Sequence, residues 1–309
     1  MNLRELEYVI ALGEEKNLTR AAERVSVTPS ALTQKLSQLE SDAGIELFQR
    51  SRKGFEPTEA GLKYIEASKQ ILQIKKDLYN ELHDMAGHYG SILNVGIFPE
   101  RGSDIFSSIY PDFISSFPDI CVNLTEASVY AQQHMISSGE LNIGFMSLTS
   151  EQRSADDYTL LYREEILIAI PEDYPLDSSE KYDPASRFPV ISLRDLRYEP
   201  FALMSSQSTF RGLQERIFRE NDMSPRILFE SARQNSILDM VSCKLCCALI
   251  SEHYVTSPHA GNVRFFSMPE HPCWDICACH KKGSYLSAPE KKLISLFSDH
   301  LNLKDKPRI

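Results

Sequence analysis

The most informative pattern in this chain is NLTRAAERVSVTPSALTQKLSQLESDAGIELFQRSRKGFEPTEAG, residues 17–61. Asn17 is a suitable cap for a short helix that contains two adjacent alanines, against which another helix could pack closely. Thr28 followed by Pro29 predicts a sharp helix start, because a hydroxyl caps the free N–H groups and proline suits the first helical position. A basic loop and a long helical pattern follow. The stretch therefore predicts a winged helix-turn-helix.

The helix that begins after Thr28 is expected to present a polar face. Its leucines recur on one side and should pack inward, which leaves short hydrogen-bonding side chains on the other side. Such a face is often only solvated. Here the short preceding helices, the sharp start and the basic loop favour contact with base edges and phosphates. The candidate DNA-binding residues are Thr28, Pro29, Ser30, Thr33, Gln34, Arg50, Arg52 and Lys53, of which the last three would contact phosphates.

Length and charge restrict the class of protein. A chain of 309 residues predicts two or three domains. The net charge of -10 argues against coating of nucleic acid by the whole protein, but residues 16–54 carry seven basic and four acidic residues. That segment is net positive, as a local DNA-binding module requires. No apolar run approaches the ~20 residues that span a bilayer, and the first residues do not resemble a signal peptide. We therefore expect a cytoplasmic protein that does not bind membranes.

About sixty residues at the start of the chain resemble the DNA-binding domain of LysR-type transcriptional regulators. The resemblance implies DNA contacts by Thr28, Ser30, Thr33, Gln34, Arg50 and Arg52. Pro29-Ser30 stands where the family commonly has Gln followed by Pro, so the operator preference should differ from that of the commonest members. The matching residues are Leu3-Arg4-Glu5-Leu6, Ala21-Ala22-Glu23-Arg24, Val27-Thr28, Ala31-Leu32-Thr33, Leu39-Glu40, Gly44-Ile45, Leu47-Phe48, Arg50 and Thr58-Glu59-Ala60-Gly61.

A long helix is predicted after Thr58, which can cap it, and should reach about residue 86. Two interleaved apolar rows with a seven-residue repeat favour a coiled-coil-like contact, although packing on its own domain is the alternative. LysR-type proteins pair through this helix, so the resemblance implies a homodimer or homotetramer. Gly87 and Gly90 predict a hinge after it. The two rows are Ile71, Leu78 and Met85, and Ile65, Leu72 and Tyr79.

From residue 91 onward, strand-like and helical segments alternate. Strands are expected at 92–98, 121–124, 143–146 and 165–170, with a helix at 105–117. This alternation predicts an α/β domain built on parallel sheets with crossover helices. The weaker resemblance in this region implies two α/β subdomains of the periplasmic-binding-protein kind, with an effector bound between them.

One segment departs from the resemblance. In LDMVSCKLCCALIS, residues 238–251, the family usually has two glycines and a final proline where this chain has Lys244, Cys246 and Ser251.

The expected organisation follows from the two regions that resemble the family. The domains are a winged helix-turn-helix at 1–58, a linker and dimerisation helix at 59–88, and an effector-binding domain at 91–309, with subdomain I at 91–164 and 266–302 and subdomain II at 165–265.

Ligands of such sheets bind at the carboxyl ends of the strands. Hydroxyl groups and free N–H groups at a helix start favour an anion, so the expected effector is a small anionic metabolite. For Ser206 and Ser208, a role as a helix cap alone is an equal alternative. The candidate effector-binding residues are Phe98, Pro99, Glu100, Gly102, Met146, Ser147, Ser205, Ser206, Ser208 and Thr209.

Six of the seven cysteines lie in two late clusters, and their spacing suggests zinc or redox chemistry. Against this, Cys277 and Cys279 alternate with apolar residues, and Cys246 and Cys247 lie in an apolar run, which favours buried thiols. We expect no metal site and no cofactor. Peroxide-sensing members of the LysR family use a cysteine pair early in the second subdomain. No cysteine occurs between Cys121 and Cys243 in this chain, so that mechanism is not expected here.

Three functions were weighed against these features. A solute-binding protein would carry an export signal and no DNA module. An enzyme would need a nucleophile, base or phosphate-binding loop at telling spacing, and none is found, so no catalytic residue is assigned. The remaining hypothesis is a sequence-specific transcriptional regulator of LysR type, with double-stranded DNA, a small-molecule effector and a second copy of itself as partners.

Base reading by the third helix can be tested with the substitution Gln34→Ala. Loss of one base contact should reduce the preference for operator over random DNA by about 1–3 kcal/mol, as measured by titrating both DNAs at one salt concentration. An equal loss of affinity for both DNAs would contradict base reading by Gln34.

Overall fold

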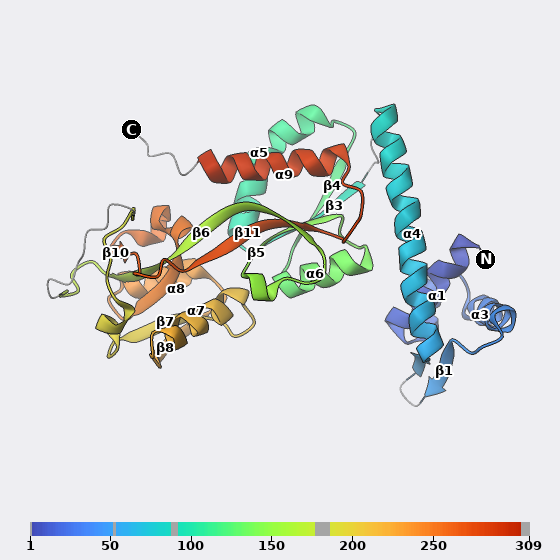
Figure 1. Cartoon of the computed structure of the whole chain (residues 1–309), viewed down its shortest axis with the longest axis horizontal. Helices are drawn as coiled ribbons and strands as arrows, with labels where there is room; N and C mark the ends of the chain where they lie inside the picture. The colour runs from blue at the N-terminus through green and yellow to red at the C-terminus, as the bar shows by residue number, and fades with distance from the viewer. Residues whose placement is uncertain (1, 52–53, 88–91, 177–185, 304–309) are drawn as a thin grey trace. The chain divides into compact units, whose positions relative to one another are not determined.

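A computed structural model describes residues 2–51, 54–87, 92–176 and 186–303 (Figure 1). They fall into two compact units, one at residues 1–90 with 284–287 and the other at 91–283 with 288–309. Within the described ranges, no helix combines the length and the apolar character needed to cross a membrane.

The first unit is a three-helix core followed by a two-stranded hairpin and a long helix. The predicted caps at Asn17, Thr28 and Thr58 are confirmed, because each side chain accepts hydrogen bonds from the first turn of its helix. At the start of the first helix, Asn2 forms a capping box with Glu5. The leucines of the third helix are buried in the core as predicted. The elements are α1 (Leu3–Glu15), α2 (Leu18–Arg24), α3 (Pro29–Ala43), β1 (Phe48–Ser51), β2 (Gly54–Pro57) and α4 (Glu59–Ala86).

The hairpin is tied to the helix that precedes it. One carboxylate oxygen of Glu40, near the end of α3, accepts hydrogen bonds from Leu47 N at 2.7 Å and Phe48 N at 3.0 Å. Gly44 ends α3 with a φ of 68°, a left-handed conformation that suits glycine. The chain therefore leaves α3 in a fixed direction, and the wing has a defined position relative to that helix.

The second unit is built on one nine-stranded sheet with the order β4-β3-β5-β11-β6-β9-β7-β8, in which β10 also pairs with β6. The pairs β3–β4, β3–β5, β7–β8 and β7–β9 are parallel. The strands are β3 (Ile92–Ile97), β4 (Cys121–Glu126), β5 (Ile143–Leu148), β6 (Asp157–Pro171), β7 (Pro200–Met204), β8 (Arg226–Ser231), β9 (Cys247–Ser251), β10 (Val263–Phe266) and β11 (Cys273–His280).

The expectation of purely parallel sheets is wrong at the centre of this unit. β6 is much longer than the predicted strand at 165–170 and is antiparallel to β9, β10 and β11. It pairs with β11 up to Glu165 and with β9 from Ile166 onward. The sheet has two halves, one that contains β4, β3 and β5 and one that contains β9, β7 and β8. The single strand β6 runs through both halves, and β11 returns beside it. Two separate parallel sheets would not allow this arrangement.

Helices cover both faces of the sheet. Phe145 and Met146 are neighbours on β5 and therefore point to opposite faces. Phe145 stacks on Phe297 of α9 with ring centroids 3.7 Å apart, whereas Met146 packs with Val129 and Ile136 of α6. The longer helices of this unit are α5 (Arg101–Ser116), α6 (Val129–Ser138), α7 (Thr209–Glu220), α8 (Gln234–Ser242) and α9 (Ala288–Leu303), with 3-10 turns at Ser150–Gln152, Leu193–Leu196, Glu252–Thr256 and Pro258–Ala260.

Helix α5 begins one turn earlier than the predicted 105–117. Its start lies directly after Glu100, whose φ of 63° turns the chain sharply out of β3. Gly102 then lies against the strand, since a Cβ at that position would approach Ile97 Cβ to 3.0 Å. The lack of a side chain at Gly102 lets the helix start close to β3.

Lys244 stands where the LysR-type proteins that this sequence resembles usually have glycine, and its backbone conformation explains why glycine suits the position. Lys244 N donates to Val241 O at 2.8 Å, and Leu245 N donates to Met240 O at 3.2 Å. These two bonds form a Schellman motif at the end of α8, in which the Lys244 position is left-handed. Its φ is 63°. The lysine side chain forms an exposed ion pair with Asp173 at 2.6 Å.

Replacing this strained residue should stabilise the unit. Lys244→Gly relieves the left-handed strain, and the melting temperature should rise by about 2–4 °C. Lys244→Ala is the matched control, because it removes the ion pair and keeps the strain. The explanation fails if the two variants melt at the same temperature by differential scanning calorimetry.

Candidate functional site

The candidate DNA-reading face lies at the start of α3. Thr28, Pro29, Ser30 and Gln34 are exposed there, and Thr33 is half-buried. The Thr28 hydroxyl accepts from Ala31 N at 3.2 Å and lies 3.1 Å from Ser30 Oγ, so it is engaged in capping the helix. Thr33 Oγ1 donates to Pro29 O at 2.9 Å. Gln34 keeps an exposed amide that can reach beyond the helix.

The predicted phosphate contacts belong to the hairpin. On β1, Arg50 lies opposite Phe55 of β2 in the antiparallel register. Arg52 and Lys53 lie outside the described residues, so their predicted contacts stay predictions.

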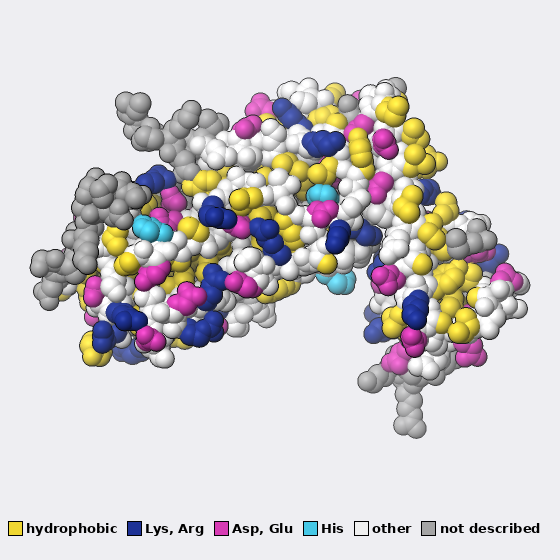
Figure 2. All heavy atoms as spheres, in the orientation of Figure 1, with side chains coloured by type: hydrophobic (Ala, Val, Ile, Leu, Met, Phe, Trp, Pro, Cys, Tyr) yellow, Lys and Arg dark blue, Asp and Glu magenta, His cyan; other side chains and the backbone are white. Residues whose placement is uncertain are grey.

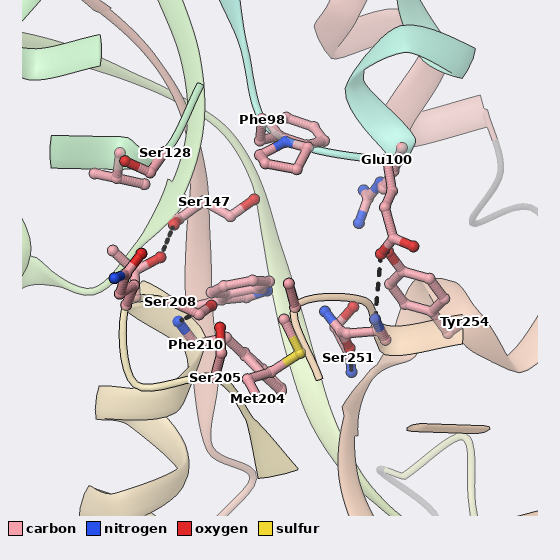
Figure 3. Close-up of a pocket in the computed structure, with 18 residues that line it drawn as sticks. Phe98, Glu100, Ser128, Ser147, Met204, Ser205, Ser208, Phe210, Ser251 and Tyr254 are labelled. Carbon is pink, nitrogen blue, oxygen red and sulfur yellow. Dashed lines mark hydrogen bonds between the residues drawn. The ribbon is translucent and has the colours of Figure 1, made fainter. Parts of the chain in front are cut away.

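A second candidate site is a cavity of about 240 Å³ in the second unit, lined by residues from both halves of the sheet (Figure 3). Its wall is largely apolar, with polar groups at the helix starts. Such a combination suits a small organic ligand. Of the predicted effector-binding residues, the structure brings together Phe98, Pro99, Glu100, Ser147, Ser205, Ser208 and Thr209 around this cavity.

Three other candidates lie outside the cavity lining. Gly102 packs against β3, as described above. Met146 is within β5 rather than after it, and its side chain is buried among α6 residues on one face of the sheet. Ser206 is exposed in the turn closed by Ser208 N donating to Ser205 O at 3.0 Å. The neighbouring Gln207 lines the cavity in its place.

Sequence reasoning missed eight of the eighteen residues in the cavity wall. Ser128 caps α6 and could have been found by the same cap rule that identified Ser208. Arg101, Met204 and Gln207 were expected near the ligand from their places beside the strand end at residue 98 and the helix start after residue 208, and they line the cavity. The remaining residues come from segments far apart in the sequence, and no local pattern relates them. The missed lining residues are Ser128, Val129, Phe210, Ala232, Gln234, Ser251, Tyr254 and Trp274.

Several helix N-termini meet at the cavity. Residues at the starts of α5, α6, α7 and α8 all line it. Ser208 Oγ accepts from Phe210 N at 3.2 Å, and Thr209 Oγ1 donates to Ser147 O at 3.2 Å, which joins α7 to the end of β5 (Figure 3). Each helix start contributes partial positive charge and N–H donors. Together they favour a ligand with a negative group.

A buried ion pair lies behind one wall of the cavity. Arg101 Nη1 donates to Glu164 Oε1 at 2.5 Å, and both side chains are at least 90% buried. The same carboxylate accepts from His253 N at 3.3 Å and from Trp274 Nε1 at 2.7 Å. Within the described residues, the Nε atom of Arg101 has no hydrogen-bond partner. The guanidinium is therefore held by Glu164 through Nη1, and its Nε–H group can still donate a hydrogen bond.

The cysteines are free thiols, and those predicted to be buried are buried. Cys277 and Cys279 lie on β11 and pack with α6, while Cys246 and Cys247 belong to the core beside β7 and β9. Burial raises the pKa of Cys279 to about 12 and that of Cys247 to about 12. Cys121 and Cys243 are exposed.

Two family models match the chain. Residues 3–62 match the bacterial regulatory helix-turn-helix protein of the lysR family, and residues 86–302 match the LysR substrate binding domain. Among curated relatives, an uncharacterized HTH-type transcriptional regulator, YcgK of Bacillus subtilis, is 22% identical over 97% of this chain and 95% of its own length. The DNA-binding transcriptional dual regulator OxyR of Escherichia coli is 28% identical over 58% of this chain and 59% of its own length.

Solved structures show the same fold. Full-length OxyR from Pseudomonas aeruginosa superposes with a TM-score of 0.66 at 21% identity, and the match covers 98% of each chain. Full-length BenM gives a TM-score of 0.57 at 20% identity over all of both chains. CbnR in complex with its target DNA gives 0.51 at 20% identity, covering 98% of this chain and 99% of CbnR.

The thiol pKa values lead to a labelling prediction. Thiolates are the reactive form, so at pH 8 Cys247 and Cys279 should be alkylated far more slowly than Cys121 in the folded protein. Mass-spectrometric mapping after timed iodoacetamide treatment would measure this, with the denatured protein as the control in which all sites react. Labelling of folded Cys279 at the rate of Cys121 would contradict the assigned burial.

Proposed function

This chain belongs to the LysR family of bacterial transcriptional regulators, and we propose that a small metabolite with a carboxylate group binds in its cavity and thereby changes its action on DNA. The chain is a DNA-binding regulator with an effector-binding domain. The proposal adds the chemical class of the effector and its binding residues. On the DNA side, α3 reads base edges with Gln34 and Ser30, and the hairpin holds phosphates.

The observation that carries the proposal is the convergence of helix starts on one apolar cavity. Phe98, Phe210 and Trp274 supply a wall for an apolar ligand body. Ser205, Ser208 and the first turn of α7 supply donors for a carboxylate. Since Glu164 neutralises much of the charge of Arg101, these N–H and hydroxyl groups are the main source of anion affinity.

Because residues of both halves of the sheet line the cavity, a bound effector contacts both halves at once. A ligand can shift a protein between arrangements only if it binds one arrangement better than another. Contacts to both halves provide such a difference, because a change in their spacing would alter the fit of the ligand.

The proposal includes pairing of two chains through α4. This helix exposes a row of large apolar side chains that its own unit does not cover, and Figure 2 shows hydrophobic side chains gathered along it. A long helix with such a row suits a partner helix. The predicted row members Leu78, Tyr79 and Met85 are exposed, whereas Ile65 packs on the core of its own unit. The exposed residues are Leu62, Ile74, Leu78, Tyr79, Leu82 and Met85.

The effector proposal is tested by a panel of small carboxylic acids and their primary amides, which match them in size but lack the charge. A bound acid at 100 times its Kd should stabilise the protein by about 2.7 kcal/mol, seen as a higher melting temperature. The same acid should change the affinity for DNA from upstream of the protein's own gene, measured against random DNA in a salt series. Equal responses to acids and amides would refute a carboxylate site.

The ion pair behind the cavity gives a stability prediction. Arg101→Gln leaves the buried Glu164 carboxylate without its countercharge, which should lower the free energy of unfolding by about 3–5 kcal/mol. The double variant with Glu164→Gln removes both charges and should recover part of that loss. Urea unfolding of the three proteins would measure it. A double variant no more stable than the single one would show that the pair is not coupled.

A further inference from the structure

One carboxylate of the chain itself already occupies part of the cavity wall. Glu100 lies after β3, which belongs to one half of the sheet. Its side chain reaches residues that follow strands β8 and β9 of the other half (Figure 3). Glu100 Oε2 accepts from Gln234 N at 3.2 Å and from Tyr254 OH at 3.1 Å. Gln234 is the first residue of α8. The carboxylate is therefore bound by a helix N-terminus and a phenol hydroxyl, as an anionic ligand would be.

The surrounding groups form a built site for this carboxylate. Gln234, Tyr254 and Ser251 are each more than 90% buried and all line the cavity. Gln234 Oε1 accepts from Ser251 N at 2.9 Å, which fixes the start of α8 on the end of β9. The fully buried Ser251 Oγ has no hydrogen-bond partner within the described residues. This hydroxyl can therefore form a further hydrogen bond beside the site.

The tyrosine is suited to act as a permanent donor. Burial raises the pKa of Tyr254 far above its ordinary value, and the adjacent Glu100 carboxylate raises it further. The hydroxyl therefore stays protonated at neutral pH. A protonated phenol donates to a carboxylate and cannot serve as a base toward a ligand.

The backbone of Glu100 is held in a conformation that L-residues rarely adopt. Its φ is 63° and its ψ is -91°. Glu100 precedes α5, but its side chain makes no capping bond to that helix. Strain of this kind persists only where the surroundings hold the residue in place. The two hydrogen bonds to the second half of the sheet are contacts of that type.

We propose that Gln234 N and Tyr254 OH form a carboxylate-binding subsite that Glu100 fills, so that Glu100 acts as a built-in ligand. This inference rests on the proposed function where it concerns the effector, which should carry a single negative charge. A second carboxylate would have to approach Glu100 or displace it, whereas a monocarboxylate can bind at α7 alone. Glu100 is then a specificity-determining residue of the cavity.

The subsite can be tested by emptying it and refilling it with acetate. Glu100→Ala removes the carboxylate, and acetate should raise the melting temperature of this variant saturably, with a half-maximal effect in the millimolar range. Wild type should show no such response, because its subsite is filled. Glu100→Gln is the matched control, since its amide occupies the same space and should exclude acetate. Acetamide and sodium chloride at equal concentrations control for polarity and ionic strength.

A second variant protects the test against poor folding. Glu100→Gly also empties the subsite, and glycine accepts the positive φ without strain, so acetate should stabilise this variant as well. Adding Tyr254→Phe to either variant removes one donor to the charged group and should weaken acetate binding about tenfold or more. The proposal is overturned if acetate stabilises neither variant, or if it stabilises wild type and Glu100→Gln to the same extent.

The outcomes separate this inference from the proposed function. Acetate rescue of Glu100→Ala together with no response of wild type to any carboxylic acid would keep the subsite and refute the carboxylate effector. Binding of a monocarboxylate by wild type, without stabilisation of the variants by acetate, would keep the carboxylate effector and refute the subsite. Tighter binding of a dicarboxylate by wild type than of the matching monocarboxylate would contradict the charge limit set by Glu100.

Discussion

The effector-binding unit depends on the hydrogen bonds of one buried carboxylate, that of Glu164. This residue lies on β6 near the point where the strand passes from one half of the sheet to the other. Its oxygens accept from Arg101 at the start of α5, from the backbone of His253 and from the indole of Trp274 on β11. A buried charge is costly unless it is paired and hydrogen-bonded. The four segments are thus fixed to one another around a single group, and they frame the cavity.

Sequence reasoning predicted the local features of this fold. Asn17, Thr28 and Thr58 all cap helices as predicted, because capping depends on residues only a few positions apart. The alternation of apolar residues with Cys277 and Cys279 correctly indicated buried thiols, which lie on β11. The same reasoning underestimated β6, because its outer part carries exposed residues and lacks a continuous apolar run. Its longest antiparallel pairing is with β11, which lies more than a hundred residues later in the chain.

The candidate site was predictable only in part, for the same reason. Phe98 lies at the end of a predicted strand and Ser208 at a predicted helix start, and the rules for α/β sheets and helix N-termini then placed them near a ligand. Gln234, Ser251 and Tyr254 join the cavity through the path of the second half of the sheet, which no short motif records. Glu100 was selected as a contact for a ligand. In the structure, its carboxylate instead binds residues more than 130 positions away.

The unbroken course of β6 has a mechanical consequence. The two halves of the effector-binding unit are joined by a strand whose backbone is hydrogen-bonded on both sides, to β11, β9 and β10. At the crossover, the pairing of β6 passes from β11 at Glu165 to β9 at Ile166, so β6 crosses between the halves without an unpaired residue. A change in the relative orientation of the halves must therefore distort the pairing or the twist of the sheet at this point. The stiffness of the sheet at the crossover, and not the length of a linker, then limits how far the halves can move.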